Sequence, residues 1–131
     1  MRILGNISTT GGIADYAHDQ ANALADLGCD IEMLCTVGFA EGRQARYRLR
    51  PELAEDLPEH RSSSRLVRRL RLSRSILHNA SVMARVIEKE RHRHVLMHFS
   101  EYLAPLWAPR LRRLQAQGVT FGSVLHDPVR D

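Results

Sequence analysis

Glycines and polar residues that follow apolar runs are the features of this sequence best suited to chemistry. Gly11 and Gly12 precede a helical pattern, where they would leave backbone N–H groups open to a phosphate or a sugar hydroxyl. His98 ends another apolar run, and His126 with Asp127 follows a third. An imidazole at such a position can donate to an oxyanion or transfer a proton. These residues are therefore the candidates for ligand binding and catalysis.

The glycine pair matches neither of the common phosphate-binding loops. Gly5 and Gly11 lie too far apart for the G-x-G-x-x-G pattern of dinucleotide-binding folds. No lysine follows Gly12, as a Walker loop would require. A tight turn that binds no ligand therefore remains an alternative for the pair.

The histidines also have structural interpretations. His126 could be a hydrogen-bonded residue at a strand end, and His98 and Glu101 could serve the fold alone. His92, His94 and His98 have spacings seen in metal sites. They straddle an expected turn and strand and would not converge, so we expect no metal ion.

Strands alternate with helices along the chain, which predicts an α/β fold with a parallel sheet and helices on both faces, a Rossmann-like arrangement. Ligands bind such sheets beyond the carboxyl ends of the strands, at the point where the strand order reverses. We expect that point between the strands that end near Gly5 and at His98. The predicted elements are a strand over 2–5, a helix over 13–27, a strand over 30–36, an edge strand over 45–50, a helical turn over 51–57, a helix over 64–91, a strand over 95–98, a helix that begins after Ser100 and is irregular or restarts at Pro109, and a strand over 119–125.

Length and composition indicate one globular domain over residues 1–131. Apolar residues make up 44% of the chain, too many for a disordered protein, and no apolar run approaches the length of a membrane span. Cys29 and Cys35 would lie at opposite ends of one strand, too far apart for a disulfide. We therefore expect reduced thiols and a cytoplasmic protein.

An arginine-rich segment begins the long helix and accounts for much of the net charge of +4. A solvated helix face is the ordinary interpretation of such a run, and an anionic membrane surface or another anionic partner is the alternative. Nucleic acid is disfavoured because no aromatic residues alternate with the arginines. The segment contains Arg61, Arg65, Arg68, Arg69, Arg71 and Arg74.

The opening of the chain resembles the N-terminal domain of GT-B glycosyltransferases of the family 4 type. The similarity runs from the first strand through Gly11-Gly12-Ile13 and Tyr16 to Gly28 and the second strand, with Cys29 where histidine is more common. The His126-Asp127 turn and the strand that ends at His98 are similar to later parts of the same domain. Residues 38–64 match poorly.

This resemblance implies a retaining hexosyltransferase that moves a sugar from a nucleotide-sugar donor to a glycan, lipid or other acceptor, without a metal ion or other cofactor. It implies catalytic roles for His126 and Asp127. The chain would be the acceptor-side domain, incomplete at its C-terminus and inactive without a donor-binding domain. The protein would lie in the cytoplasm or on the inner face of the cell membrane. The implied substrate-binding residues are Gly11, Gly12, Tyr16, His98 and Glu101.

Two other classes of function remain open on the sequence. One is a small α/β module that binds a nucleotide or phosphate without catalysis. The other is a basic domain that binds a membrane surface or a protein partner through its arginine-rich segment.

Overall fold

The structure, a computed structural model, describes residues 1–8, 11–55, 64–98 and 104–124. Strands and helices alternate along the described chain, and the long helix α3 is its largest element. The elements are β1 (Arg2–Ile7), α1 (Gly12–Asp26), β2 (Asp30–Cys35), α2 (Val37–Ala40), β3 (Arg48–Arg50), α3 (Arg65–Glu90), β4 (His94–His98), α4 (Ala104–Ala116) and β5 (Thr120–Val124).

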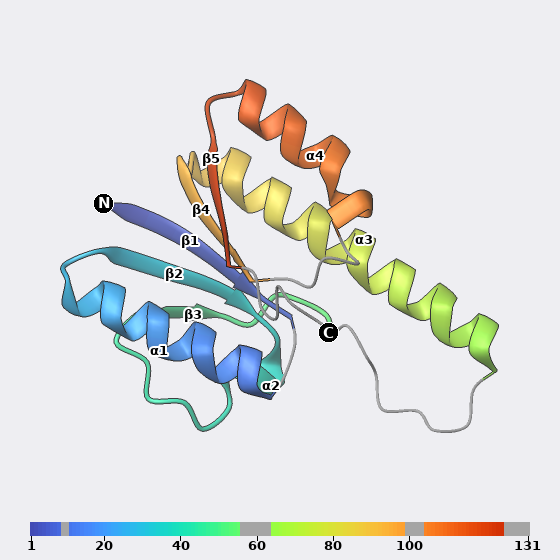
Figure 1. The fold of residues 1–131 in the computed structure, drawn as a ribbon, viewed down its shortest axis with the longest axis horizontal. Coiled ribbons are helices and arrows are strands. Elements are labelled where there is room, and N and C mark those ends of the chain that lie inside the picture. The colour runs from blue at the N-terminus through green and yellow to red at the C-terminus, as the bar shows by residue number, and fades with distance from the viewer. Residues whose placement is uncertain (9–10, 56–63, 99–103, 125–131) are drawn as a thin grey trace, which may run out of the picture.

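The five strands form one sheet in the order β3-β2-β1-β4-β5, and every neighbouring pair is parallel. Helix α1 covers one face of the sheet, and α3 and α4 lie side by side on the other (Figure 1). The strand order reverses direction at β1, because β2 and β3 follow on one side and β4 and β5 on the other. The predicted Rossmann-like α/β fold and the switch point beside β1 and β4 are confirmed.

Alternation along each strand divides the core into two layers. On one face, Ile3 and Ile7 of β1 pack with the alanines of α1. On the other, Leu4 and the neighbouring strands pack against α3 and α4. The sheet is thus covered by a packed layer on each face.

The inward face of α3 differs from the predicted one. From the helical period of the sequence we expect an inward stripe of Leu66, Leu70, Leu77, Ala80, Ala84 and Ile87. Ala80 and Ile87 are buried as expected, but the three leucines are exposed by 67%, 63% and 42%. The buried stripe runs through Ile76, Ala80, Met83 and Ile87, so the C-terminal half of the expected stripe is confirmed and the N-terminal leucines are not part of the core. The N-terminal end of α3 extends past the other elements (Figure 1), which accounts for the exposure of Leu66 and Leu70. Leu77 follows the buried Ile76, so it lies on the outer side of the helix.

Smaller differences occur at irregular segments. The edge strand is only Arg48–Arg50, and residues 51–55 form no helical turn. Helix α2 was not predicted; the Thr36 hydroxyl caps it by accepting from Phe39 N at 3.2 Å. Helix α4 continues through Pro109 and does not restart there. In the described part of the chain, no helix has the length and apolar character that a membrane crossing needs.

Candidate functional site

The loop between β1 and α1 brings two glycines to the carboxyl edge of the sheet. Gly11 precedes the helix with φ 78° and ψ −154°, a conformation that side chains disfavour. Gly12 is the first residue of α1. Among the described residues, an added Cβ at either glycine would meet nothing within 4 Å. The N-cap Gly11 makes no side-chain cap hydrogen bond, so the first-turn N–H groups have no capping side chain within the described chain, as an anion or hydroxyl ligand requires.

Tyr16 and His98 lie beside this turn. Their ring centroids are 6.4 Å apart with a 60° tilt, and they come from α1 and from the end of β4. Strand pairing places His98 next to Ile7, the last residue of β1. His98 is fully buried, whereas Tyr16 is about half exposed. The structure thus brings four of the predicted substrate-binding residues to one corner of the sheet.

The remaining predicted site residues lie outside the described part of the chain. They are His126 and Asp127, to which catalytic roles were assigned, and Glu101. Their roles stay predictions.

Sequence reasoning missed further polar residues at this edge. Asn6 in β1 and Ser8 after it are both buried, and the Asn6 Oδ1 atom has no hydrogen-bond partner among the described residues. A buried acceptor without a partner is uncommon and is typical of a place where a ligand or water binds. The signal in the sequence was a polar residue between the buried positions of a strand.

A cation also stands near the first turn of α1. The Arg43 guanidinium donates to Asp15 Oδ1 at 2.7 Å, and its carbon lies 4.5 Å from the centre of the Phe39 ring. Asp15 sits in the first turn of α1, where the helix dipole favours a negative charge. Arg43 is thereby held where it could approach an anionic ligand at the glycines.

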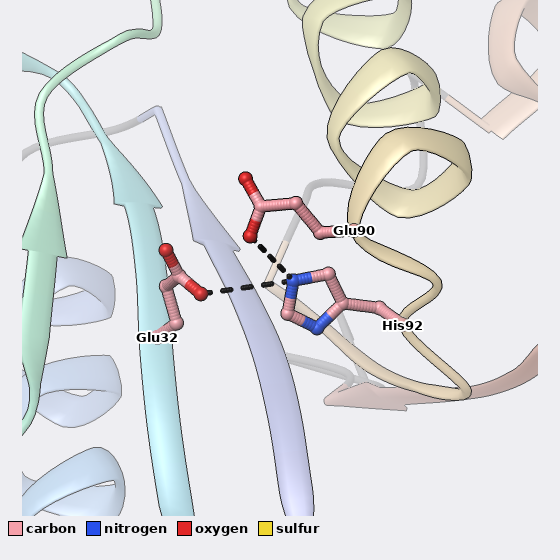
Figure 2. A group of neighbouring side chains, drawn as sticks. All are labelled: Glu32, Glu90 and His92. Carbon is pink, nitrogen blue, oxygen red and sulfur yellow. Dashed lines mark ion pairs between the residues drawn. The ribbon is translucent and has the colours of Figure 1, made fainter.

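A second polar cluster occupies the other half of the sheet (Figure 2). Glu32 on β2 and Glu90 at the end of α3 turn their carboxylates toward His92, whose Nε2 lies 3.6 Å and 3.5 Å from their oxygens. Arg50 Nη1 donates to Glu32 at 3.0 Å and to Glu90 at 2.6 Å. Arg2 Nη2 donates to the same two carboxylates, at 3.1 Å and 3.0 Å.

Charge balance explains the protonation states within this cluster. The bond from Arg50 lowers the pKa of Glu90, although burial opposes it. Burial also works against the charge of Arg50, but its bonds to Glu90, Glu52 and Glu32 outweigh that and raise its pKa. Burial, assisted by the positive charge of Arg2, lowers the pKa of His92. The imidazole is therefore neutral near pH 7.

The ligand atoms of Glu32, Glu90 and His92 lie within 4.8 Å of one another, close enough to consider a metal ion. Both carboxylates already accept from two guanidinium groups, which neutralise their charge. A divalent cation would add two uncompensated positive charges to a largely buried place. We therefore assign the cluster a structural role: it fixes the end of α3 to β1, β2 and β3.

The arginine-rich segment lies mainly on the projecting part of α3. Arg65, Arg69, Arg71 and Arg74 are exposed on this helix. Arg61 and the side chain of Arg68 fall outside the described part of the structure.

Comparison with known proteins supports the fold. No protein-family model matches the chain, and no curated protein matches it. Its structure is similar to part of MurG from Acinetobacter baumannii, with a TM-score of 0.60 and 20% sequence identity. The match covers 95% of this chain and 35% of the MurG chain, so the chain spans about a third of that protein's length. At this identity the likeness shows the fold, a Rossmann-like domain of the GT-B type, and the assignment to family 4 stays a prediction.

Proposed function

We propose that this chain is the acceptor-side N-terminal domain of a glycosyltransferase that uses a nucleotide-sugar donor. The observation that carries the proposal is the open first turn of α1, with Gly11 at positive φ and Gly12 free of neighbouring side chains. Its N–H groups would bind a donor phosphate or a sugar hydroxyl. Tyr16 and His98 beside it would line the place of the sugar.

The rest of the proposal follows the resemblance in the sequence. A second domain would supply most donor contacts, and the two domains together would transfer the sugar with retention. The reaction would use no metal ion. His126 and Asp127 would act at the transferring sugar, where an imidazole stabilises charge that develops as the glycosidic bond breaks.

Substitution of Gly12 tests the binding role of the turn. In a protein that carries this chain with its donor-binding domain, Gly12→Val should abolish transfer, because the branched side chain would fill the space that a ligand needs. Asp19→Val places the same side chain at an exposed position about two turns further along α1 and should leave transfer unchanged. Full activity of a folded Gly12→Val protein would refute the role.

The proposed role of His126 has a kinetic test in the same protein. His126→Ala should lower kcat by roughly 10²–10⁴-fold and change KM little, because the interaction acts chiefly in the transition state. A variant that folds and keeps nearly all of the wild-type kcat would make His126 a structural residue. Binding of a nucleotide sugar without transfer to any acceptor would instead favour the module without catalysis.

A second proposed function rests on the exposed leucines of α3. Leu66 and Leu70 lie among exposed arginines on the projecting part of the helix, and the exposed Leu77 follows further along it. Apolar side chains flanked by cations are typical of helices that lie on anionic lipid, where each basic residue near the surface contributes about 1 kcal/mol. We propose that this end of α3 holds the domain at the inner face of the cell membrane.

Vesicle sedimentation tests this membrane contact. The domain should bind anionic vesicles at low salt, bind them less at high salt, and not bind neutral vesicles. Leu70→Ser should weaken binding, whereas Leu27→Ser, at a leucine that is 80% exposed on the other face of the protein, should not. Equal binding to neutral and anionic vesicles, or none to either, would leave α3 as a solvated face.

A further inference from the structure

A groove of about 350 Å³ lies between α3 and α4, on the face of the sheet opposite α1. Four cationic side chains line it, and a single carboxylate, Glu88, accompanies them. The cations are Arg85 and Lys89 from α3 with Arg110 and Arg113 from α4. Neither the sequence motifs nor the proposed transferase site uses this groove.

Pairing within the groove leaves an excess of positive charge. The guanidinium of Arg113 forms an ion pair with the Glu88 carboxylate, so these two charges neutralise each other. Arg85, Lys89 and Arg110 have no carboxylate partner within the described ranges 1–8, 11–55, 64–98 and 104–124. Three cations thus share one groove, and no described residue supplies a carboxylate to pair with them.

Arg110 is held in position before any ligand arrives. Its Nη2 donates to Ser81 Oγ at 3.2 Å, and the Ser81 hydroxyl donates to the carbonyl oxygen of Leu77 at 2.8 Å. Arg110 is partly buried between the two helices, and the groove also contacts the buried side chain of Leu114. One edge of the guanidinium is engaged by Ser81, which leaves its other N–H donors for a ligand.

We propose that the groove binds a phosphate group through Arg85, Lys89 and Arg110. A phosphate supplies several strong acceptor oxygens and up to two negative charges, which suit three cations and the planar donor pattern of arginine. Ala84 and Leu114 offer apolar contact to the carbon skeleton attached to it. A phospholipid headgroup and a soluble phosphate ester share this chemistry. The proposal stands apart from glycosyl transfer, since the glycine turn lies on the α1 side of the sheet.

The test is an NMR titration of the 131-residue chain with inorganic phosphate, with chloride at matched ionic strength as reference. Phosphate should cause saturable shifts of amides over residues 81–89 and 110–114, in the millimolar range expected for a small anion, and chloride should not. Arg110→Gln should weaken the apparent affinity about tenfold, because it removes the charge and the preorganised donors.

Arg112→Gln is the matched control, because Arg112 is an exposed cation of the same helix that does not line the groove. It should change the affinity less than about twofold. The proposal is overturned if phosphate produces no saturable shifts. It is also overturned if Arg112→Gln weakens binding as much as Arg110→Gln, because the attraction is then a diffuse surface charge.

Two further arms separate the sources of the phosphate. If glycerol phosphate competes with inorganic phosphate and Arg110→Gln does not change vesicle binding, the natural ligand is a soluble phosphate ester. If Arg110→Gln reduces sedimentation of the protein with phosphatidylglycerol vesicles, and Leu70→Ser leaves the phosphate-induced shifts unchanged, the ligand is a lipid headgroup. Either result supports the phosphate site. Neither experiment measures transferase activity. Absence of phosphate binding would therefore leave the transferase proposal intact, and absence of transferase activity would leave the phosphate site intact.

Discussion

Polar groups at the two ends of the sheet differ in whether the fold supplies them with partners. At the carboxyl edge, Gly11 and Gly12 face open space, and the buried Asn6 Oδ1 atom has no partner in the described chain. Toward the amino edge, each oxygen of Glu32 accepts from a guanidinium, and His92 fills the space beside it (Figure 2). The second region pairs its carboxylates with guanidinium groups within the fold, although the ring nitrogens of His92 have no hydrogen-bond partner among the described residues.

This difference separates candidate function from structure. A buried charge is stable only when its partners are in place, so the Glu32 cluster has little capacity left for a ligand. An unfilled backbone turn has the reverse property, because its N–H groups gain from a partner that the fold does not supply. The turn before α1 is therefore the better candidate for a ligand site than the Glu32 cluster.

Removal of the Glu32 carboxylate should have the largest effect on stability. Glu32→Ala would leave the guanidinium groups of Arg2 and Arg50 without their most buried partner, at a cost of about 3 kcal/mol in the free energy of unfolding. Urea denaturation measures the loss. Glu41→Ala, at an exposed carboxylate outside the cluster, should change it by less than about 0.5 kcal/mol. Similar values for the two variants would contradict the structural role of the cluster.

Alanine at the two glycines should have smaller and unequal effects. Gly11→Ala should cost about 2 kcal/mol, because an L side chain is strained at φ 78° and ψ −154°. Gly12→Ala should leave stability equal or slightly higher, by up to about 1 kcal/mol, because Gly12 is helical and its surroundings are open. Thermal unfolding of both variants measures these changes in stability. A large loss of stability in Gly12→Ala would mean that the turn is packed against neighbouring residues.

Acid should destabilise the cluster of Glu32, Glu90 and His92 by protonating His92. Its pKa is lowered in the folded state by burial and by Arg2, so the unfolded chain binds the proton more readily. The free energy of unfolding should therefore fall as the pH drops below the ordinary histidine value of about 6.5, and protonation of Glu90 adds to the loss at still lower pH.

His92→Gln should flatten this pH dependence between about pH 7 and 5, and His94→Gln, at an exposed histidine, should not. Denaturation midpoints across that range provide the measurement. A His92→Gln slope equal to the wild-type slope would show that the imidazole does not carry the effect.

The smallest effect concerns a thiol at the carboxyl end of β2. Burial raises the pKa of Cys35 to about 11, so the folded protein should hold almost no thiolate there at pH 8 and should react slowly with a disulfide reagent. In denaturant the same thiol should react quickly, and Cys35→Ala identifies its share of the signal. Fast reaction in the folded protein would mean that the open region extends into the core.

Much of the architecture was predictable because it depends on local pattern. The apolar alternation of the strands, Gly28 after α1 and Ser64 before α3 are short-range signals, and the structure places element ends close to them. The parallel sheet followed from the alternation of strands and helices. The glycine turn could be located for the same reason, since the helix begins directly after it.

The rest required distances that the sequence does not contain. Arg2, Glu32, Arg50 and Glu90 are separated by 18 to 88 residues, and only the packing of α3 on the sheet brings them together. The leucines of α3 follow a helical period, but whether a core lies beneath them depends on where the sheet ends. Arg110 gains its place from Ser81 on a neighbouring helix. Sequence alone determined most of the elements and the turn before α1, because these follow from local backbone and side-chain preferences. Tertiary structure decided which charges are neutralised and which remain available, because Coulomb interactions and burial depend on distance in space.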